Sequence, residues 1–453
     1  MKSIKYIFLL LIAALMFNAC SEELEEINTN PNALTEVDLR LMIPEAIVQS
    51  FFNLGTNPAR VSGLIMKQFV GLDAQQIAFM NYDLKANDMD GYWSTGLYSG
   101  ALRSCSAIIE KADAEGDATF YSGVAKILMA NQYGIATSMF GDIPRSEALL
   151  GLSTPRPVYD SQESVYAFVQ DLLDEGIAEL GSASGYAGGD LVYDGDAAAW
   201  IAAAQGLKAR FYMHTSNRTG DYASALTAIN SSFTSLATQP NLQFEASATA
   251  NHALAKFGQE RPGTLGFHPD FAAMLEGDPR AASYYGGEFD YYVEGSLPWS
   301  RNDATLPLIS YVELKVMQAE IMTRNGMDAS AVLEEAINAS MAQIGVDDMG
   351  VYAAANSDLS GLSEDAAINQ IMTEAYKAYY GYNFIETWTN YRRTGFPDIT
   401  PQNNTANGLN PGGQIPRRFP YTDSEFAANE ENVDAAIEAQ GGGTLNINVW
   451  AFQ

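Results

Sequence analysis

The sequence predicts a mainly α-helical protein of stacked helix pairs, interrupted by one irregular, aromatic-rich insertion. Three observations support this prediction. Hydrophobic residues make up 47% of the 453 positions, which is enough apolar material for a large packed core. Apolar residues recur at helical spacing along most of the chain, and pairs such as Gly116-Asp117 and Gly141-Asp142 separate the helical segments. Residues 240–305 break this pattern with prolines, glycines and tyrosines.

The N-terminus has the pattern of an export signal. Lys2 and Lys5 precede an apolar run, Tyr6–Phe17, whose twelve residues would span about 18 Å as a helix, well short of the roughly 30 Å hydrocarbon core. Residues 1–19 are therefore predicted to be a signal peptide rather than a spanning helix. Ala19-Cys20 at its end resembles a bacterial lipobox, in which the cysteine carries the lipid. The alternative is ordinary cleavage that leaves Cys20 free.

The second cysteine is predicted to be structural. If Cys20 carries lipid, Cys105 has no partner within the chain. Leu97, Ala101, Cys105 and Ile108 recur at helical spacing, so we expect Cys105 to be a small buried hydrophobe.

Residues 20–453 are predicted to form one helical-repeat domain. The segments with helical periodicity are Trp93–Ala114, Thr119–Met139, Ser161–Leu180, Asp196–Thr215, Leu308–Asn325, Ala329–Ile344 and Glu364–Tyr391. Helix–turn–helix units of about thirty-five residues resemble tetratricopeptide repeats. Segments 181–195 and 400–418 are rich in Gly, Asn and Pro and are predicted to be loops.

The insertion at about 240–305 cannot continue a helical stack. It holds Pro262, Pro269, Pro279 and Pro298, together with an aromatic run from Tyr284 to Tyr292. We expect short strands there at most. Because the insertion is too long for an idle loop in a compact domain, we expect it to form part of a ligand-binding face.

Charge and motif content exclude several classes of function. The 55 acidic and 25 basic residues give a net charge of −30, which disfavours nucleic acid, anionic lipid surfaces and polyanionic ligands. The three histidines and two cysteines are too scattered for a zinc site, and no metal or cofactor is predicted. The sequence also contains no Gly-x-Ser-x-Gly elbow, His-Glu-x-x-His pair or phosphate loop, so we expect no enzyme.

Five segments together with the lipobox resemble the SusD/RagB-like family of Bacteroidota outer-membrane lipoproteins. In order, they are Ile27–Asn32 (INTNPN), Phe140–Ala148 (FGDIPRSEA), Trp200–Arg210 (WIAAAQGLKAR), Glu313–Glu320 and Trp388–Pro397 (WTNYRRTGFP). The acidic tract Ser21–Glu26 is similar to the export tags of surface lipoproteins in that group. The resemblance implies a SusD-like fold and a lipid-anchored, surface-exposed position on the outer membrane. It also implies capture of a polysaccharide or oligosaccharide and its delivery to a SusC-like TonB-dependent transporter.

The chemistry of the residues in these motifs, apart from the resemblance, indicates a structural role rather than ligand binding. Arg392 and Arg393 follow aromatic residues at helical spacing, and such guanidinium groups usually tie helices together through buried carboxylates. Glu313 or Glu320 could be the partner. Trp200 and Trp388 lie on apolar stripes and are predicted to belong to the core.

A glycan binder needs aromatic rings for the apolar faces of sugars and polar groups for their hydroxyls. Two segments offer both, residues 81–93 and 284–302, and the family resemblance points to the same two places. The candidate glycan contacts are Trp299, Trp93, Tyr92, Tyr292, Tyr291, Tyr285, Asn87, Asp88, Arg301 and Asn302. Trp299 is predicted to be an exposed platform. For Trp93 the alternative is packing at the start of a helix.

Other possibilities stay open at this stage. Asp88, Asp90 and Gly91 imitate part of an EF-hand, but the first and twelfth ligand positions fall on Ala86 and Leu97, so that match fails. A different oxygen-rich calcium site remains open. The alternative functions are a glycoside hydrolase, which needs only two carboxylates, and a non-binding scaffold lipoprotein. The strong negative charge favours a neutral glycan, for example a β-glucan such as laminarin.

Overall fold

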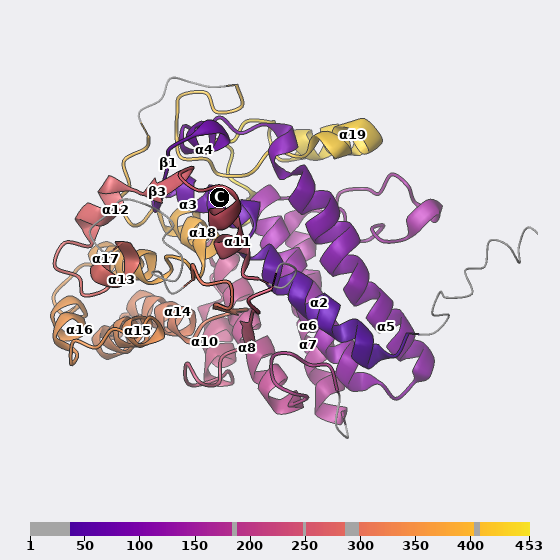
Figure 1. The fold of residues 1–453 in the computed structure, drawn as a ribbon, viewed down its shortest axis with the longest axis horizontal. Coiled ribbons are helices and arrows are strands. Elements are labelled where there is room, and N and C mark those ends of the chain that lie inside the picture. The colour runs from indigo at the N-terminus through magenta and orange to yellow at the C-terminus, as the bar shows by residue number, and fades with distance from the viewer. Residues whose placement is uncertain (1–36, 184–187, 248–250, 286–298, 403–407) are drawn as a thin grey trace, which may run out of the picture. The chain divides into compact units, whose positions relative to one another are not determined.

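A computed structural model describes residues 37–183, 188–247, 251–285, 299–402 and 408–453. Within it, Leu39–Gln453 cluster into one body. Helices dominate this body, as predicted, and pack as successive pairs (Figure 1). No helix in the described part of the chain is long and apolar enough to span a bilayer.

The first half of the body is a stack of helices with α6 at its centre. Its elements are α2 (Leu39–Asn53), α3 (Asn57–Ile65), α4 (Ala74–Met80), the 3-10 turn η1 (Ala86–Met89), the π-helix η2 (Gly91–Leu102), α5 (Arg103–Glu115), α6 (Thr119–Phe140), α7 (Gln162–Ser182), α8 (Ala197–His214), α9 (Ser216–Thr219) and α10 (Tyr222–Asn230). Nearly every side chain of α6 is buried between α5 and α7. The predicted 93–114 helix therefore exists, but its first half is a π-helix that runs directly into α5.

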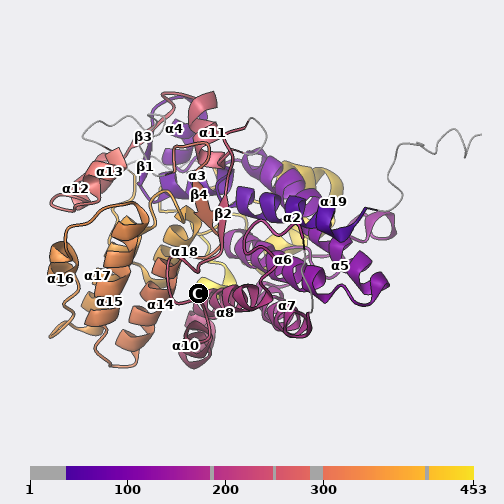
Figure 2. The same cartoon turned by 60° about the horizontal axis from the view of Figure 1, so that its bottom comes forward.

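The second half repeats the helix pairing. Its helices are α14 (Tyr311–Arg324), α15 (Ser330–Gln343), α16 (Val351–Asn356), α17 (Glu364–Ala378), α18 (Phe384–Thr394) and α19 (Asp423–Ala439), followed by the terminal 3-10 turn η4 (Trp450–Phe452). Figure 2 shows α14, α15 and α17 side by side, in agreement with their contacts. The segment 364–391, predicted as one helix, is broken between α17 and α18. Gly381 sits in this corner with φ of 83°, a conformation that favours glycine.

The insertion contains both short strands and short helices. Strand β2 (Asn241–Gln243) pairs antiparallel with β4 (Thr305–Pro307), which closes the two ends of the insertion together. Strand β3 (Leu265–Phe267) pairs antiparallel with β1 (Phe69–Gly71). This pairing joins the insertion to the N-terminal part of the body.

The expectation of strands at most is wrong, because the insertion also forms three helices. These are α11 (Ala253–Glu260), α12 (Pro269–Met274) and α13 (Ala281–Tyr285). The prolines do not prevent them, since Pro269 occupies the first turn of α12, where its missing N–H costs nothing.

The core confirms three predictions about single residues. Trp200, Trp388 and Cys105 are each fully buried. Burial raises the pKa of the Cys105 thiol to about 12, so this side chain behaves as a small hydrophobe.

Candidate functional site

Trp299 is a core residue and not an exposed platform. Its side chain has 0% exposed area, and its ring packs edge-on against Phe69 and Tyr380, with centroid separations of 6.1 and 5.8 Å. A Cβ atom at Gly381 would lie 1.8 Å from this ring, so the α17–α18 corner closes directly over it. The expectation of an exposed ring is therefore wrong. The physical reason is that Trp299 joins the insertion to the helical core.

Trp93 packs in the core at the start of η2, which was the alternative to ligand contact. It is 2% exposed and meets the rings of Phe140 and Tyr98 at 4.9 and 5.2 Å. The neighbouring Tyr92 is 6% exposed and stacks on Phe140 with an interplanar angle of 8°. The indole rings of Trp93 and Trp299 are therefore both too buried to stack on a sugar. Tyr92, in contrast, lies at the border of a pocket described below.

The remaining candidates are scattered. Arg301 is exposed and makes a two-point ion pair with Asp303, at 2.8 and 2.7 Å. The backbone carbonyl of Asn302 accepts a hydrogen bond from His252 N at 2.8 Å. Asn87 is exposed on η1. Tyr291 and Tyr292 lie outside the described residues, as does the side chain of Tyr285.

A pocket of about 510 Å³ lies between the predicted 81–93 segment and helix α11 of the insertion, and no described residue of the predicted 284–302 segment lines it. We call it the α11 pocket. It is lined by Gln49, Phe52, Asn53, Thr56, Asn57, Arg60, Asp88, Gly91, Tyr92, Thr95, Gly96, Ala253, Lys256, Phe257 and Glu260. Its walls come from α2 and α3, from η1 and η2, and from α11 of the insertion. Of the predicted contacts, it contains Asp88 and Tyr92 and omits Trp93, Trp299, Asn87, Arg301 and Asn302.

The π-helix η2 forms one wall of this pocket. A Cβ atom at Gly96 would lie 2.9 Å from Asn53 Oδ1, so glycine allows the helix to approach α2 closely. Asn53 Nδ2 donates to the Gly96 carbonyl at 2.9 Å and to Gln132 Oε1 at 2.8 Å. These hydrogen bonds attach the wider π-helical backbone of η2 to α2 and α6 in the core. π-Helical turns are rare in proteins, and those that do occur are often found at functional sites.

The opposite wall is the amphipathic helix α11. Its Leu254 and Ala255 face the core, while Phe257 is half-buried at the pocket. The guanidinium carbon of Arg60 lies 3.9 Å from the centre of the Phe257 ring, and Arg60 Nη2 donates to Asn57 Oδ1 at 3.1 Å. This stacking holds an aromatic surface and an Arg–Asn pair in fixed positions beside one another.

Asp88 is held by its own loop and by α4. One carboxylate oxygen accepts Lys85 N at 2.7 Å and the other accepts Gln75 Nε2 at 2.8 Å. Burial raises the pKa of the Asp88 carboxyl, although these hydrogen bonds oppose the rise. Asn57 Nδ2 donates to the Asp88 carbonyl at 2.7 Å, which joins η1 to α3.

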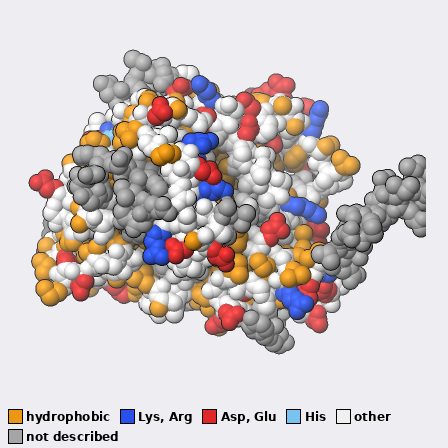
Figure 3. All heavy atoms as spheres, in the orientation of Figure 1, with side chains coloured by type: hydrophobic (Ala, Val, Ile, Leu, Met, Phe, Trp, Pro, Cys, Tyr) orange, Lys and Arg blue, Asp and Glu red, His pale blue; other side chains and the backbone are white. Residues whose placement is uncertain are grey.

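The charges of the described residues that line the α11 pocket balance. Arg60 and Lys256 contribute two positive charges, and Asp88 and Glu260 contribute two negative ones. Lys256 and Glu260 form no ion pair with another described residue. Figure 3 shows acidic and basic side chains side by side over the region of α11. The described residues contain no group of three His, Cys, Asp or Glu side chains that could hold a metal ion.

Arg60, Lys256 and Phe257 were missed by sequence reasoning. A signal for α11 was present, since Leu254, Phe257 and Gly258 recur at helical spacing beside Lys256 and Glu260. The surrounding prolines obscured it.

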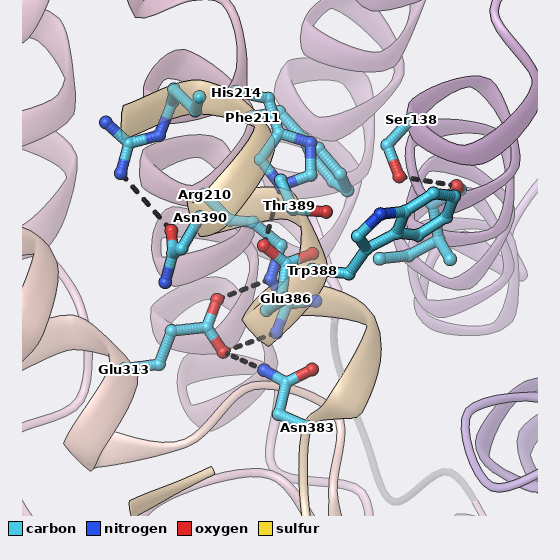
Figure 4. Close-up of polar contacts among 12 residues, drawn as sticks. Ser138, Arg210, Phe211, His214, Glu313, Asn383, Glu386, Trp388, Thr389 and Asn390 are labelled. Carbon is cyan, nitrogen blue, oxygen red and sulfur yellow. Dashed lines mark hydrogen bonds and ion pairs between the residues drawn. The ribbon is translucent and has the colours of Figure 1, made fainter. Parts of the chain in front are cut away.

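The family motifs at 200–210, 313–320 and 388–397 do not line the α11 pocket. Their polar side chains belong to a buried network (Figure 4). Arg210 binds Glu313 through two hydrogen bonds of 2.6 and 2.7 Å, and Asn383 Nδ2 donates to Glu313 at 2.8 Å. His214 Nε2 lies 2.8 Å from Glu386 Oε2. All of these carboxylates are buried, so their role is to join α8, α14 and α18.

The two arginines of α18 have different partners. Arg393 pairs with Glu320, as predicted for one of the two candidate carboxylates. Arg392 instead lies 3.7 Å from the centre of the Trp388 ring and donates to backbone carbonyls, including that of Ser138.

Comparison with known proteins agrees with this fold. Residues 31–422 match the SusD-like family described as starch-binding and associating with the outer membrane. A chitin-binding protein superposes with a TM-score of 0.77 at 22% identity, covering 91% of this chain and 99% of its own. A SusD/RagB family protein from Bacteroides thetaiotaomicron gives a TM-score of 0.75 at 23% identity, covering 92% of this chain and 99% of its own.

A chitin-binding SusD homologue from Flavobacterium johnsoniae gives a TM-score of 0.73 at 20% identity, covering 91% of this chain and 98% of its own. At these identities the superpositions show the fold alone. A search among curated proteins gives no match. The match over residues 31–422 spans most of the chain, and the protein belongs to the SusD-like family of outer-membrane-associated glycan-binding proteins.

Proposed function

We propose that this protein is a cell-surface lipoprotein that captures a neutral polysaccharide or oligosaccharide in the α11 pocket and delivers it to a SusC-like TonB-dependent transporter. The observation that carries the proposal is the pocket itself, which combines aromatic side chains, amides and balanced charges. Its volume of about 510 Å³ lies within the range of small-ligand sites and suits a short stretch of a glycan chain.

The pocket favours a neutral ligand on electrostatic grounds. A polyanionic glycan would meet no net positive charge there and would approach a chain of net charge −30. Phe257 and Phe52 supply apolar surface for sugar rings, while Gln49, Asn57 and Lys256 can bond to hydroxyls. We propose a β-linked neutral glycan such as laminarin. Chitin oligosaccharides are the second candidate, because two structural neighbours are chitin-binding proteins.

We propose binding without catalysis. Asp88 and Glu260 give the pocket two carboxyls, the minimum for glycoside hydrolysis. However, both Asp88 oxygens already accept hydrogen bonds that hold the η1 turn. Membership of a carbohydrate-binding family also favours a binder.

A glycan panel tests this proposal. The soluble form lacking residues 1–20 is run in affinity gels that contain laminarin, soluble chitin derivatives or alginate, and the release of reducing sugar is measured in parallel. We expect retardation by a neutral glycan, little change of that retardation with added salt, and no sugar release. Sugar release would support the hydrolase, and the absence of retardation in every gel would support the scaffold.

Two further experiments test the anchor and the partner, both of which rest on the resemblance. Cys20 lies outside the described residues. Replacing it (Cys20→Ser) should move the protein from the membrane fraction to the soluble fraction. Mild detergent extraction of the native protein should recover a large TonB-dependent transporter with it. A mutant that stays in the membrane, or an extract that never contains a transporter, would contradict the respective proposal.

A further inference from the structure

A second hollow, of about 200 Å³, lies between α7, α8 and the C-terminal turn η4. We call it the Trp450 pocket, and define it by Trp450, Tyr212, Glu163, Gln170, Thr219 and Asp221. The described residues that line it are all different from those that line the α11 pocket. In Figure 2 the C-terminus lies beside α8, well away from α11.

Trp450 is the only tryptophan placed to contact a ligand. The chain has five tryptophans, and Trp93, Trp200, Trp299 and Trp388 are all 2% exposed or less. Trp450 is half-buried, and Tyr212 beside it is half-buried too. Tyr166 and Phe211, both buried, complete the apolar floor, and the Tyr166 hydroxyl already bonds His214 Nδ1 at 3.0 Å.

The rim of the hollow carries hydrogen-bonding groups with spare capacity. Gln170 donates through Nε2 to the Lys208 carbonyl at 3.2 Å, but its buried Oε1 has no donor among the described residues. Asp221 uses Oδ1 to cap α10, accepting Ser224 N at 3.0 Å. Glu163 is exposed, with no side-chain hydrogen bond in the described part of the chain. Sugar hydroxyls can donate to the carboxylates of Glu163 and Asp221.

The charges favour an uncharged polyol over a cation. Two carboxylates beside aromatic rings could in principle attract an ammonium group. However, the guanidinium carbon of Arg218 lies 5.3 Å from the centre of the Trp450 ring, so a second cation on that ring would be repelled. The carboxylates of Glu163 and Asp221 equally disfavour an anion.

We propose that the Trp450 pocket is a second carbohydrate site, which takes one pyranose ring, such as a chain end or a branch. Its volume of about 200 Å³ lies below the usual range for larger ligands, which restricts it to a single ring. The ligand class rests on the proposed function, whereas the site does not depend on the α11 pocket. A second site would let one protein hold two points of a polysaccharide, or two chains.

Fluorine NMR tests this site directly. The protein is labelled with 5-fluorotryptophan, and the Trp450 resonance is identified by its absence in Trp450→Phe. Glucose, N-acetylglucosamine and laminaribiose are then titrated in. We expect one of these sugars to shift the Trp450 resonance in the millimolar range, typical of a single ring. No shift at tens of millimolar of any of them would overturn the proposal.

Two variants make the result specific. Glu163→Gln removes a rim charge from a side chain that makes no hydrogen bond with the described residues. It should weaken sugar binding in the titration several-fold and leave the melting temperature unchanged. An unchanged titration in this variant would contradict the assigned rim. Phe257→Ala disables the α11 pocket only and should leave the Trp450 shift intact.

Those variants also separate the two proposals. A Trp450 shift that disappears in Phe257→Ala would be an effect relayed from the α11 pocket, and would overturn the second site. A Trp450 shift in a protein that retains no polysaccharide in affinity gels would support the second site while contradicting the proposed function.

Discussion

The buried network around α18 and the α11 pocket contain the same kinds of side chain with opposite consequences. Both place an arginine over an aromatic ring, Arg392 over Trp388 at 3.7 Å and Arg60 over Phe257 at 3.9 Å. Around α18, Trp388, Arg392 and Arg393 are buried, and the arginines bond to a carboxylate or to backbone carbonyls. At α11 the same pairing borders an open pocket. The residue types alone therefore do not distinguish scaffold from site.

This difference explains why the family motifs identify the fold and not the ligand. In this chain Glu313, Glu320 and Arg393 join α8, α14 and α18, and Trp388 is fully buried in the core. The α11 pocket is lined by side chains from the insertion and from the N-terminal helices, which none of those motifs includes.

Breaking the buried network should produce the largest effect on stability. Glu320→Ala would leave Arg393 buried without its carboxylate partner, and we expect a loss of about 3–5 kcal/mol in the free energy of unfolding. Glycan affinity of the folded fraction should not change. Chemical denaturation together with calorimetric titration measures both quantities.

The matched control is the exposed pair Arg301–Asp303. Asp303→Ala removes a carboxylate with similar two-point geometry, but in water, and should have little effect on stability. Equal losses for Glu320→Ala and Asp303→Ala would mean that the α18 network does not support the scaffold.

Removing the buried side chain of Trp299 should lower the free energy of unfolding by a similar or slightly smaller amount. Because Trp299 is fully buried against Phe69 and Tyr380, Trp299→Ala should lower the free energy of unfolding by about 3–5 kcal/mol. The glycan affinity of the folded protein should stay within a few-fold of the parent. A tenfold loss of affinity at an unchanged melting temperature would restore Trp299 as a ligand platform.

Much of the helical scaffold could be predicted from the sequence. The predicted boundaries at Thr119–Met139 and Leu308–Asn325 lie within three residues of α6 and α14, because Gly and Asp mark helix ends by local chemistry. The break at Gly381 could not be predicted. The ring of Trp299, which lies about eighty residues away in the chain, fills the space beside that glycine, and no local pattern connects the two.

The site was predicted only as a region. Residues of the 81–93 segment do line the α11 pocket, but the insertion contributes α11 and no described residue of 284–302, because the exposure of individual aromatics depends on tertiary packing. Trp93 and Trp299 have neighbours in sequence that look like loops, yet Trp93 contacts Phe140 of α6 and Trp299 contacts Tyr380 in the α17–α18 corner. The π-helix likewise depends on Asn53 and Gln132, which no local pattern connects to Gly96.

Acid should produce a smaller effect, centred on a histidine beside the pocket. Burial lowers the pKa of His252 to about 4, against about 6.5 in an unfolded chain. The unfolded state therefore takes up a proton that the folded state excludes. The corresponding stability is complete above pH of about 6.5 and falls as the pH drops toward about 4.

The melting temperature should accordingly decline over that pH interval, and His252→Phe should flatten the decline. Phenylalanine can occupy the same site against the Phe244 ring, which lies 5.2 Å from the imidazole. His214 and His268 also have lowered pKa values because of burial, so part of the decline should remain. A parallel pH profile in the variant would show that His252 makes no contribution.

The central claim is that the aromatic surface of the α11 pocket, and not the aromatic core, recognises the glycan. Calorimetric titration of the glycan retained in affinity gels tests it most directly, with Phe257→Ala compared to Phe168→Ala. The two phenylalanines are matched, because both are half-buried on helices and both lie under a guanidinium, Arg60 at 3.9 Å and Arg145 at 4.7 Å. Phe257→Ala should weaken binding about tenfold, or about 1.4 kcal/mol, while Phe168→Ala leaves affinity unchanged. Equal affinities in the parent protein and both variants would contradict the claim.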